Sequence, residues 1–381
     1  MKFLNDQRRM YLLSACLLAL TIVLCCTWSL WGDREPVSDS PAGAESGAQT
    51  GVEGDASIEP SVTPQIRETV SPEPSPEATK SAQTVNAVVY YQDNNGYLVP
   101  VMREMPLQDG IARATLAMMV SSPHNDMEAA RLGLRTVMPE GTDIDLDISG
   151  GAARVNLTGP ISKLPDAAAE SNMVSAIVQT LTEFDTVETV RFLINGREVE
   201  TLAHGTPVSG PFKRGALNLE SVSSTFPVDD AQTVTLYFAG ETGSLIVPVT
   251  RMVYGEADLN TAVLELLKGP GASSPLESAL PAGCGLIDVT RDKDGKVTIN
   301  LTSEFSELIN STDGGRQALR SLALTCAQFP GVSSVEVLVN GQPFDEGAST
   351  MGVPTFVNDA ETVADQFLQT QSRLLFGPDD E

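Results

Sequence analysis

The chain contains one set of motifs twice, and this internal repeat constrains its fold more than any other feature. Val-Pro-Val-x-Arg occurs at residues 99–103 and again at 247–251. Pro-x-Gly, Asn-Leu-Thr and a final Asn-Gly follow it in the same order in both copies, at residues 139–141 and 281–283, 156–158 and 300–302, and 195–196 and 340–341. Matching motifs lie 142 to 148 residues apart. Motifs repeated in one order indicate two tandem copies of one domain.

The pattern within each copy predicts the order β-β-α-β-β-α-β. Runs of β-branched and aromatic residues around a glycine turn predict a hairpin at 85–103 and at 234–251. Helical spacing follows at 111–120 and 259–268, and a second hairpin comes next, with Asp294-Gly295 as its turn in the second copy. A longer helix then presents one apolar face, formed by Val174, Ile177, Leu181 and Phe184 or by Leu319, Leu322, Cys326 and Phe329. We expect an α+β sandwich with its helices against one sheet face.

Seven segments follow from the repeat and from the composition around it. They are a basic stub (1–9), a membrane anchor (10–32), a linker (33–84), the first repeat (85–205), an inter-domain linker (206–232), the second repeat (233–350) and a tail (351–381). The tail has a weak amphipathic pattern, so we expect it to form a helix that packs on the second repeat.

Residues 10–32 predict a membrane anchor with the amino terminus in the cytoplasm and the bulk of the chain outside it. No charged residue occurs from Met10 to Trp31, and Lys2, Arg8 and Arg9 precede this stretch. About 20 apolar residues are enough to cross the hydrocarbon core, and the basic flank stays inside. A lipoprotein signal is the alternative, with lipidation at Cys25 or Cys26, although the small residue preferred before such a cysteine is missing.

The linker 33–84 predicts a disordered tether. It contains seven prolines and no Phe or Trp or Tyr. A segment rich in Pro, Ser and Glu cannot bury enough apolar surface to offset the entropy of ordering.

Composition excludes several functions. Lys and Arg total 24 against 50 Asp and Glu, for a net charge of −26, whereas a nucleic-acid-binding protein needs a cationic surface. Only two histidines, His124 and His204, are present, and no Ser or Cys is spaced to act with either as a nucleophile. We therefore expect no catalytic residue, no cofactor and no bound metal.

Asp143, Asp145 and Asp147 form the one candidate binding surface. A calcium-binding EF-hand loop would need Gly at its sixth position and Glu at its twelfth, where this chain has Ile148 and Arg154. Alternation with apolar residues instead places the three carboxylates on the solvent face of a strand. That face is either simply solvated or a contact for a basic partner.

Two cysteines of the second repeat leave an alternative open. Cys326 lies on the apolar face of the predicted helix, which favours a core thiol, and Cys284 lies in a turn. A Cys284–Cys326 disulfide is the other reading, and spacing alone does not decide between them.

Both copies resemble GerMN domains, the tandem modules of GerM-like sporulation and spore-germination proteins. The resemblance covers residues 85–350 and rests on Leu-Leu-Lys-Gly-Pro (266–270), Leu-Pro-Ala-Gly (280–283), Asn-Leu-Thr-Ser-Glu-Phe (300–305) and the final Val-Asn-Gly. It implies an envelope protein of endospore-forming bacteria with domains like the ring-building modules of secretion systems.

The resemblance also implies a role in assembling the channel apparatus between mother cell and forespore. We therefore expect a non-catalytic assembly or scaffolding protein whose partners are envelope or channel proteins, or further copies of itself. It would lie in the intermembrane space or on the cell-wall side. The alternative is an extracytoplasmic ligand-binding module for cell-wall fragments or a small effector, with its site between the copies.

Overall fold

The computed structural model describes residues 83–220, 231–310, 314–345 and 349–376. The predicted stub, the anchor, Cys25, Cys26 and nearly all of the tether lie outside these residues. Within the described ranges, no helix is long and apolar enough to cross a membrane.

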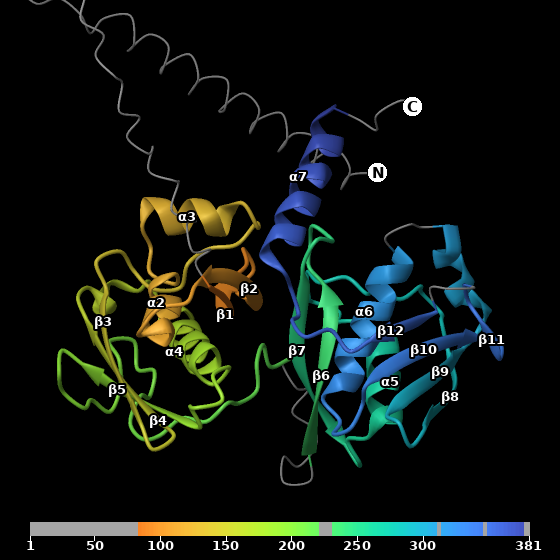
Figure 1. The fold of residues 1–381 in the computed structure, drawn as a ribbon, viewed down its shortest axis with the longest axis horizontal. Helices are drawn as coiled ribbons and strands as arrows, with labels where there is room; N and C mark the ends of the chain where they lie inside the picture. Colours follow the sequence, from red (N-terminus) through yellow and green to blue (C-terminus); the bar gives the residue numbers. More distant parts are fainter. Residues whose placement is uncertain (1–82, 221–230, 311–313, 346–348, 377–381) are drawn as a thin grey trace, which may run out of the picture. The chain divides into compact units, whose positions relative to one another are not determined.

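The first repeat distributes its strands over two sheets (Figure 1). Strands β1 (Thr84–Gln92) and β2 (Leu98–Pro106) form an antiparallel hairpin. A three-stranded mixed sheet consists of β3 (Asp143–Ser149), β4 (Ala152–Thr158) and β5 (Thr189–Ile194), with β3 antiparallel and β5 parallel to β4. The helices are α2 (Ile111–Ala117), α3 (Pro123–Ala130), the short 3-10 helix η1 (Ile161–Lys163) and α4 (Ala167–Leu181).

The second repeat has the same arrangement with additional short strands. A hairpin of β6 (Ala231–Ala239) and β7 (Ile246–Tyr254) precedes α5 (Leu259–Leu267). The mixed sheet runs β11-β10-β9-β8, with β12 also paired to β10. Its elements are β8 (Leu286–Arg291), β9 (Lys296–Leu301), η3 (Ser303–Asn310), α6 (Gly314–Ala327), β10 (Ser334–Val339), β11 (Gln342–Pro343) and β12 (Thr350–Gly352). The predicted α+β class is confirmed, and the predicted element order holds in both copies apart from the additional helix α3 in the first and the short strands β11 and β12 in the second.

The long helix of each repeat buries the apolar face that its sequence predicts. Ile177 and Leu181 of α4, and Leu322 and Cys326 of α6, have no exposed surface. Asp166 caps α4, because its carboxylate accepts the Ala169 N–H at 2.8 Å. Helix α4 contacts both β1 and β5, and α6 contacts both β6 and β10, so the helices pack on both sheets of a repeat rather than on one sheet face as expected.

The carboxy-terminal segment packs only in part as expected. Helix α7 (Ala360–Phe376) forms in the predicted tail, but it contacts β2, and the Phe367 ring lies against Gly133 of the first repeat. The residues before α7 bond both repeats. Arg320 Nη2 of α6 donates to the Phe356 carbonyl at 2.7 Å, and the Met102 N–H of β2 donates to the Asn358 carbonyl at 2.8 Å. The start of the segment thus bonds the second repeat as expected, whereas α7 itself contacts β2 of the first repeat.

Candidate functional site

Strand β3 carries the three predicted carboxylates on one exposed face. Asp143, Asp145 and Asp147 are exposed, whereas Ile144 between them is buried against the core. The side chains of Asp143 and Asp147 keep 76% and 60% of their surface. Within the described sheet β3 pairs only with β4 and is an edge strand, and Arg113 Nε of α2 donates to its Ile144 carbonyl at 2.7 Å.

Ion pairs neutralise this acidic face only in part. Arg113 Nη2 lies 3.4 Å from Asp143, and Arg154 Nη2 lies 3.2 Å from Asp147. Both pairs are exposed and contribute little to stability. Asp145 has no hydrogen bond or ion pair to any described residue, so the centre of the face is open to a partner.

The carboxylates of β3 do not converge on a point where an ion could bind. Residues two apart on a strand are about 6.5 Å apart along it. Across the part of the chain that the structure describes, no group of three His, Cys, Asp or Glu side chains could hold a metal ion.

The two histidines are far from any reactive arrangement. His124 is exposed near the start of α3. The His204 ring contacts the Leu164 carbonyl through Nε2 at 2.7 Å, and its backbone N–H donates to Glu170 at 2.8 Å. His204 is therefore held within its loop rather than fully solvated. Its one ring partner is a carbonyl oxygen, which cannot act as a nucleophile.

Cys284 and Cys326 are separate buried thiols, and this excludes the disulfide alternative. Burial raises the pKa of Cys284 to about 11 and that of Cys326 to about 12. A thiol with so high a pKa is almost fully protonated at neutral pH and is a poor nucleophile. Cys326 is therefore a core residue.

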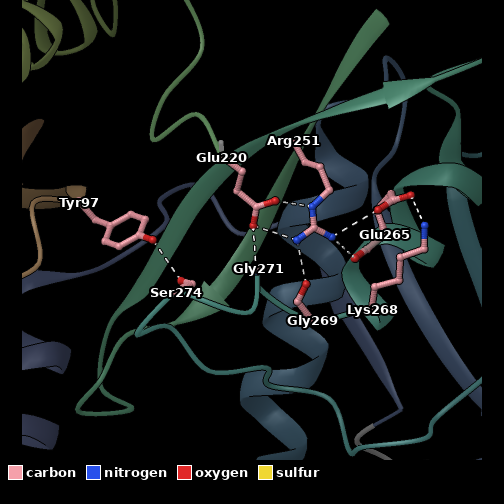
Figure 2. Close-up of polar contacts among 8 residues, drawn as sticks. All are labelled: Tyr97, Glu220, Arg251, Glu265, Lys268, Gly269, Gly271 and Ser274. Carbon is pink, nitrogen blue, oxygen red and sulfur yellow. Dashed lines mark hydrogen bonds and ion pairs between the residues drawn. The ribbon is translucent and has the colours of Figure 1, made fainter. Parts of the chain in front are cut away.

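The sequence reading missed a charged cluster around Arg251 of β7. Figure 2 shows its guanidinium between Glu220 of the inter-domain linker and Glu265 of α5. Nε and Nη2 donate to the two Glu220 oxygens at 2.6 and 2.8 Å, while Nη1 donates to the Glu265 carbonyl at 2.8 Å. Nη2 also donates to the Gly269 carbonyl at 2.8 Å. All three nitrogens are satisfied in an enclosed site, which makes this a rigid structural cluster.

Arg103 of β2 lies at the matching position and makes two such hydrogen bonds. Its Nη1 donates to the Glu128 carboxylate at 3.0 Å and its Nη2 to the Glu128 carbonyl at 3.1 Å. The guanidinium lies over the Tyr91 ring at 5.6 Å, as Arg251 lies over Phe238 at 5.7 Å. The repeated Val-Pro-Val-x-Arg motif could have drawn attention to Arg103 and Arg251, but it gave no indication of the glutamates that bind them.

Two clefts lie at the junction of the repeats. One, of about 590 Å³, includes Tyr90, Glu183, Arg214 and Tyr237. Tyr90 Oη donates to Glu183 at 2.7 Å and accepts from Arg214 Nη2 at 2.8 Å, and burial raises the pKa of Tyr90 well above its ordinary value. The second cleft, of about 750 Å³, is lined largely by Ser and Asn side chains and by backbone.

Comparison with known proteins confirms the resemblance. The model of the family Germane, described as sporulation and spore germination, matches residues 88–200 and 235–345. Over 279 residues the chain is 28% identical to "Spore germination protein GerM" of Bacillus subtilis (strain 168), covering 70% of this chain and 74% of that protein. The solved tandem GerMN domains of the sporulation protein GerM from Bacillus subtilis match with a TM-score of 0.61 and 27% identity, over 73% of this chain and 99% of that one.

The family matches fall on the two repeats, each with its hairpin, mixed sheet and long helix. The chain therefore belongs to the Germane family of sporulation and spore-germination proteins.

Proposed function

We propose that this chain is a non-catalytic assembly or scaffolding factor of the sporulation envelope, acting in the channel apparatus between mother cell and forespore. Its partners would be envelope or channel proteins, or further copies of itself. The similarity to GerM supports the setting. The acidic face of β3 is the observation that carries the contact role.

The exposed acidic face of the edge strand β3 suits recognition by a protein. An edge strand offers unpaired backbone groups to a partner strand, and exposed carboxylates favour a partner of positive charge. The same carboxylates discourage pairing between two β3 edges, because like charges would meet. A protein with a positively charged surface is therefore the partner that this strand favours.

Charge reversal tests the contact. Asp143→Lys, Asp145→Lys and Asp147→Lys together should preserve folding, because the face is exposed, and should lower the yield of heat-resistant spores. The control reverses three exposed carboxylates elsewhere in the first repeat, at Asp185, Glu198 and Glu200. A normal spore yield with the β3 variant, or an equal loss with both variants, would remove this face as the contact.

We further propose that residues 10–32 anchor the chain in the cell membrane. The charge-free stretch and its basic flank support an uncleaved helix. A Cys25→Ala, Cys26→Ala double variant should then stay in the membrane fraction. Its release into the soluble fraction would establish lipidation instead.

A ligand-binding module is the second candidate, favoured by the cleft at Tyr90, Glu183 and Arg214. A concave site with convergent polar groups suits a small polar ligand. If cell-wall fragments bind there, soluble muropeptides should raise the thermal midpoint of the full chain, and Arg214→Met should abolish the shift. The assembly proposal expects no shift in either protein.

A further inference from the structure

Two asparagines join the repeats in equivalent ways. Asn218, in the inter-domain linker, donates through Nδ2 to the Leu98 and Pro248 carbonyls at 2.8 and 2.7 Å. Its Oδ1 accepts the Leu98 N–H at 2.8 Å. One side chain thus bonds β2 of the first repeat and β7 of the second.

Asn358 makes the same set of bonds with the repeats exchanged. Its Nδ2 donates to the Pro100 and Ile246 carbonyls at 2.9 and 2.8 Å, and its Oδ1 accepts the Ile246 N–H at 2.8 Å. Pro100 matches Pro248, and Ile246 matches Leu98, each pair 148 residues apart. The linker and the carboxy-terminal segment are therefore equivalent straps, related by exchange of the two repeats.

The straps differ two residues after the asparagine. The linker has Glu220 at this position, and the carboxy-terminal segment has Ala360. The Glu220 N–H donates to the Thr250 carbonyl of β7 at 2.9 Å, and Asp359 bridges to Met102, the matching residue of β2. Ala360 thus occupies the place in the first repeat that Glu220 occupies in the second. It brings no carboxylate to Arg103.

The consequence is a cluster with one carboxylate too few. In the second repeat, Arg251 and Lys268 share Glu220 and Glu265. In the first, Arg103 and Arg131 share Glu128 alone, and this residue lies on α3, whereas Glu265 lies on α5. Arg103 Nε, whose counterpart bonds Glu220, is buried and has no partner in the described part of the chain. A buried donor without an acceptor is unfavourable and marks an unfilled position.

A cleft of about 640 Å³ opens at this position. Its lining includes two cations, four carboxylates and Ala360: Arg103, Arg131, Glu104, Glu128, Asp359, Glu361 and Ala360. Arg131 is 56% exposed and Arg103 15% exposed, so a ligand meets both cations from the cleft. The Arg103 Nε atom itself is enclosed.

We propose that this cleft binds the carboxylate of a small zwitterion, in the position that Glu220 takes in the second repeat. Arg103 and Arg131 supply the two cations for the carboxylate. The ligand must also carry a positive group, because Glu104, Asp359 and Glu361 would repel a simple anion. The site is independent of the proposed assembly role, since it lies on β2, α3 and the first turn of α7 rather than on β3.

Titration calorimetry of the full chain in detergent tests the site, with β-alanine as the probe. We expect a Kd of about 1 mM, which is reasonable for six non-hydrogen atoms. Acetate and ethylamine at the same ionic strength separate the two charges, and each should bind at least about tenfold more weakly. No binding of β-alanine would overturn the proposal, and equal binding of acetate would overturn its zwitterionic part.

Substitutions then locate the binding. Arg131→Gln should weaken β-alanine binding at least about tenfold, while Arg191→Gln, at an exposed arginine of β5, should not change it. Ala360→Glu should supply the missing carboxylate, abolish binding and raise the thermal midpoint above that of Ala360→Gln. Unchanged binding in Arg131→Gln, or in a folded Ala360→Glu variant, would place the probe elsewhere and contradict the assignment.

Discussion

Glu220 is the single residue on which the charged cluster of the second repeat depends. Its side chain is 20% exposed and accepts two short bonds from Arg251, which is 13% exposed. Glu220→Gln removes the charge while keeping the shape, so one donor of Arg251 loses its acceptor. We expect the free energy of unfolding to fall by about 1–3 kcal/mol in urea titrations. Glu256→Gln, at an exposed loop position, is the control and should change it by less than about 0.5 kcal/mol. Equal effects would mean that the cluster adds nothing to stability.

Single residues also show what sequence reasoning could not reach. Asp143, Asp145 and Asp147 were placed correctly on an exposed strand face, because alternation is a local signal. Glu220, Asn218 and Asn358 gave no such signal, since their partners are distant in sequence; Asn358 and Pro100 are 258 residues apart. In a loop sequence, an isolated Asn or Glu cannot be told from an ordinary solvated residue. Only the fold shows that such a residue is buried.

Secondary-structure elements were the most predictable part of the chain. Hairpins and helices follow from the periodicity of apolar residues. Gly295 illustrates what local sequence patterns do not show. Its φ of +84° suits the predicted Asp-Gly turn, but a Cβ there would also lie 2.1 Å from the Gly331 carbonyl oxygen. The turn chemistry was readable, whereas the tertiary contact was not. The packing of α7 was missed for the same reason, because contacts with other elements determine it. Helix α3 was missed although Ser122 caps it and Pro123 is its first residue, which is a local start signal.

Helix α5 allows a test at the element scale. Asp258 caps it by accepting the Thr261 N–H at 2.8 Å, and this bond holds the pKa of Asp258 below its ordinary value. Asp258→Ala should cost about 0.5–2 kcal/mol at pH 7. Because the folded pKa is the lower one, the stabilisation is present above the unfolded pKa of 3.8 and is lost as the pH falls through the folded pKa. Denaturant titrations at pH 7 and near pH 2 should therefore show the difference shrinking. A difference independent of pH would contradict the charged cap.

At the scale of the whole molecule, the two straps make the repeats one unit. Asn358 is 4% exposed, and its loss would leave the Pro100 and Ile246 carbonyls and the Ile246 N–H buried without a side-chain partner. We expect Asn358→Ala to lower the free energy of unfolding by about 2–4 kcal/mol. Asn94→Ala, at an exposed position in the β1–β2 turn, is the matched control. If both variants unfold alike, the strap does not join the repeats as described.

The central claim is that the chain acts through a protein contact at β3, and crosslinking in cells that are forming spores tests it most directly. A photo-crosslinking amino acid replaces Asp145 in one full-length variant and Glu198, an exposed residue of the same repeat, in another. The account predicts a discrete covalent adduct with another envelope protein from position 145, none from position 198, and loss of the adduct when Asp143 and Asp147 are changed to Lys. No adduct from position 145, or the same adducts from both positions, would contradict it.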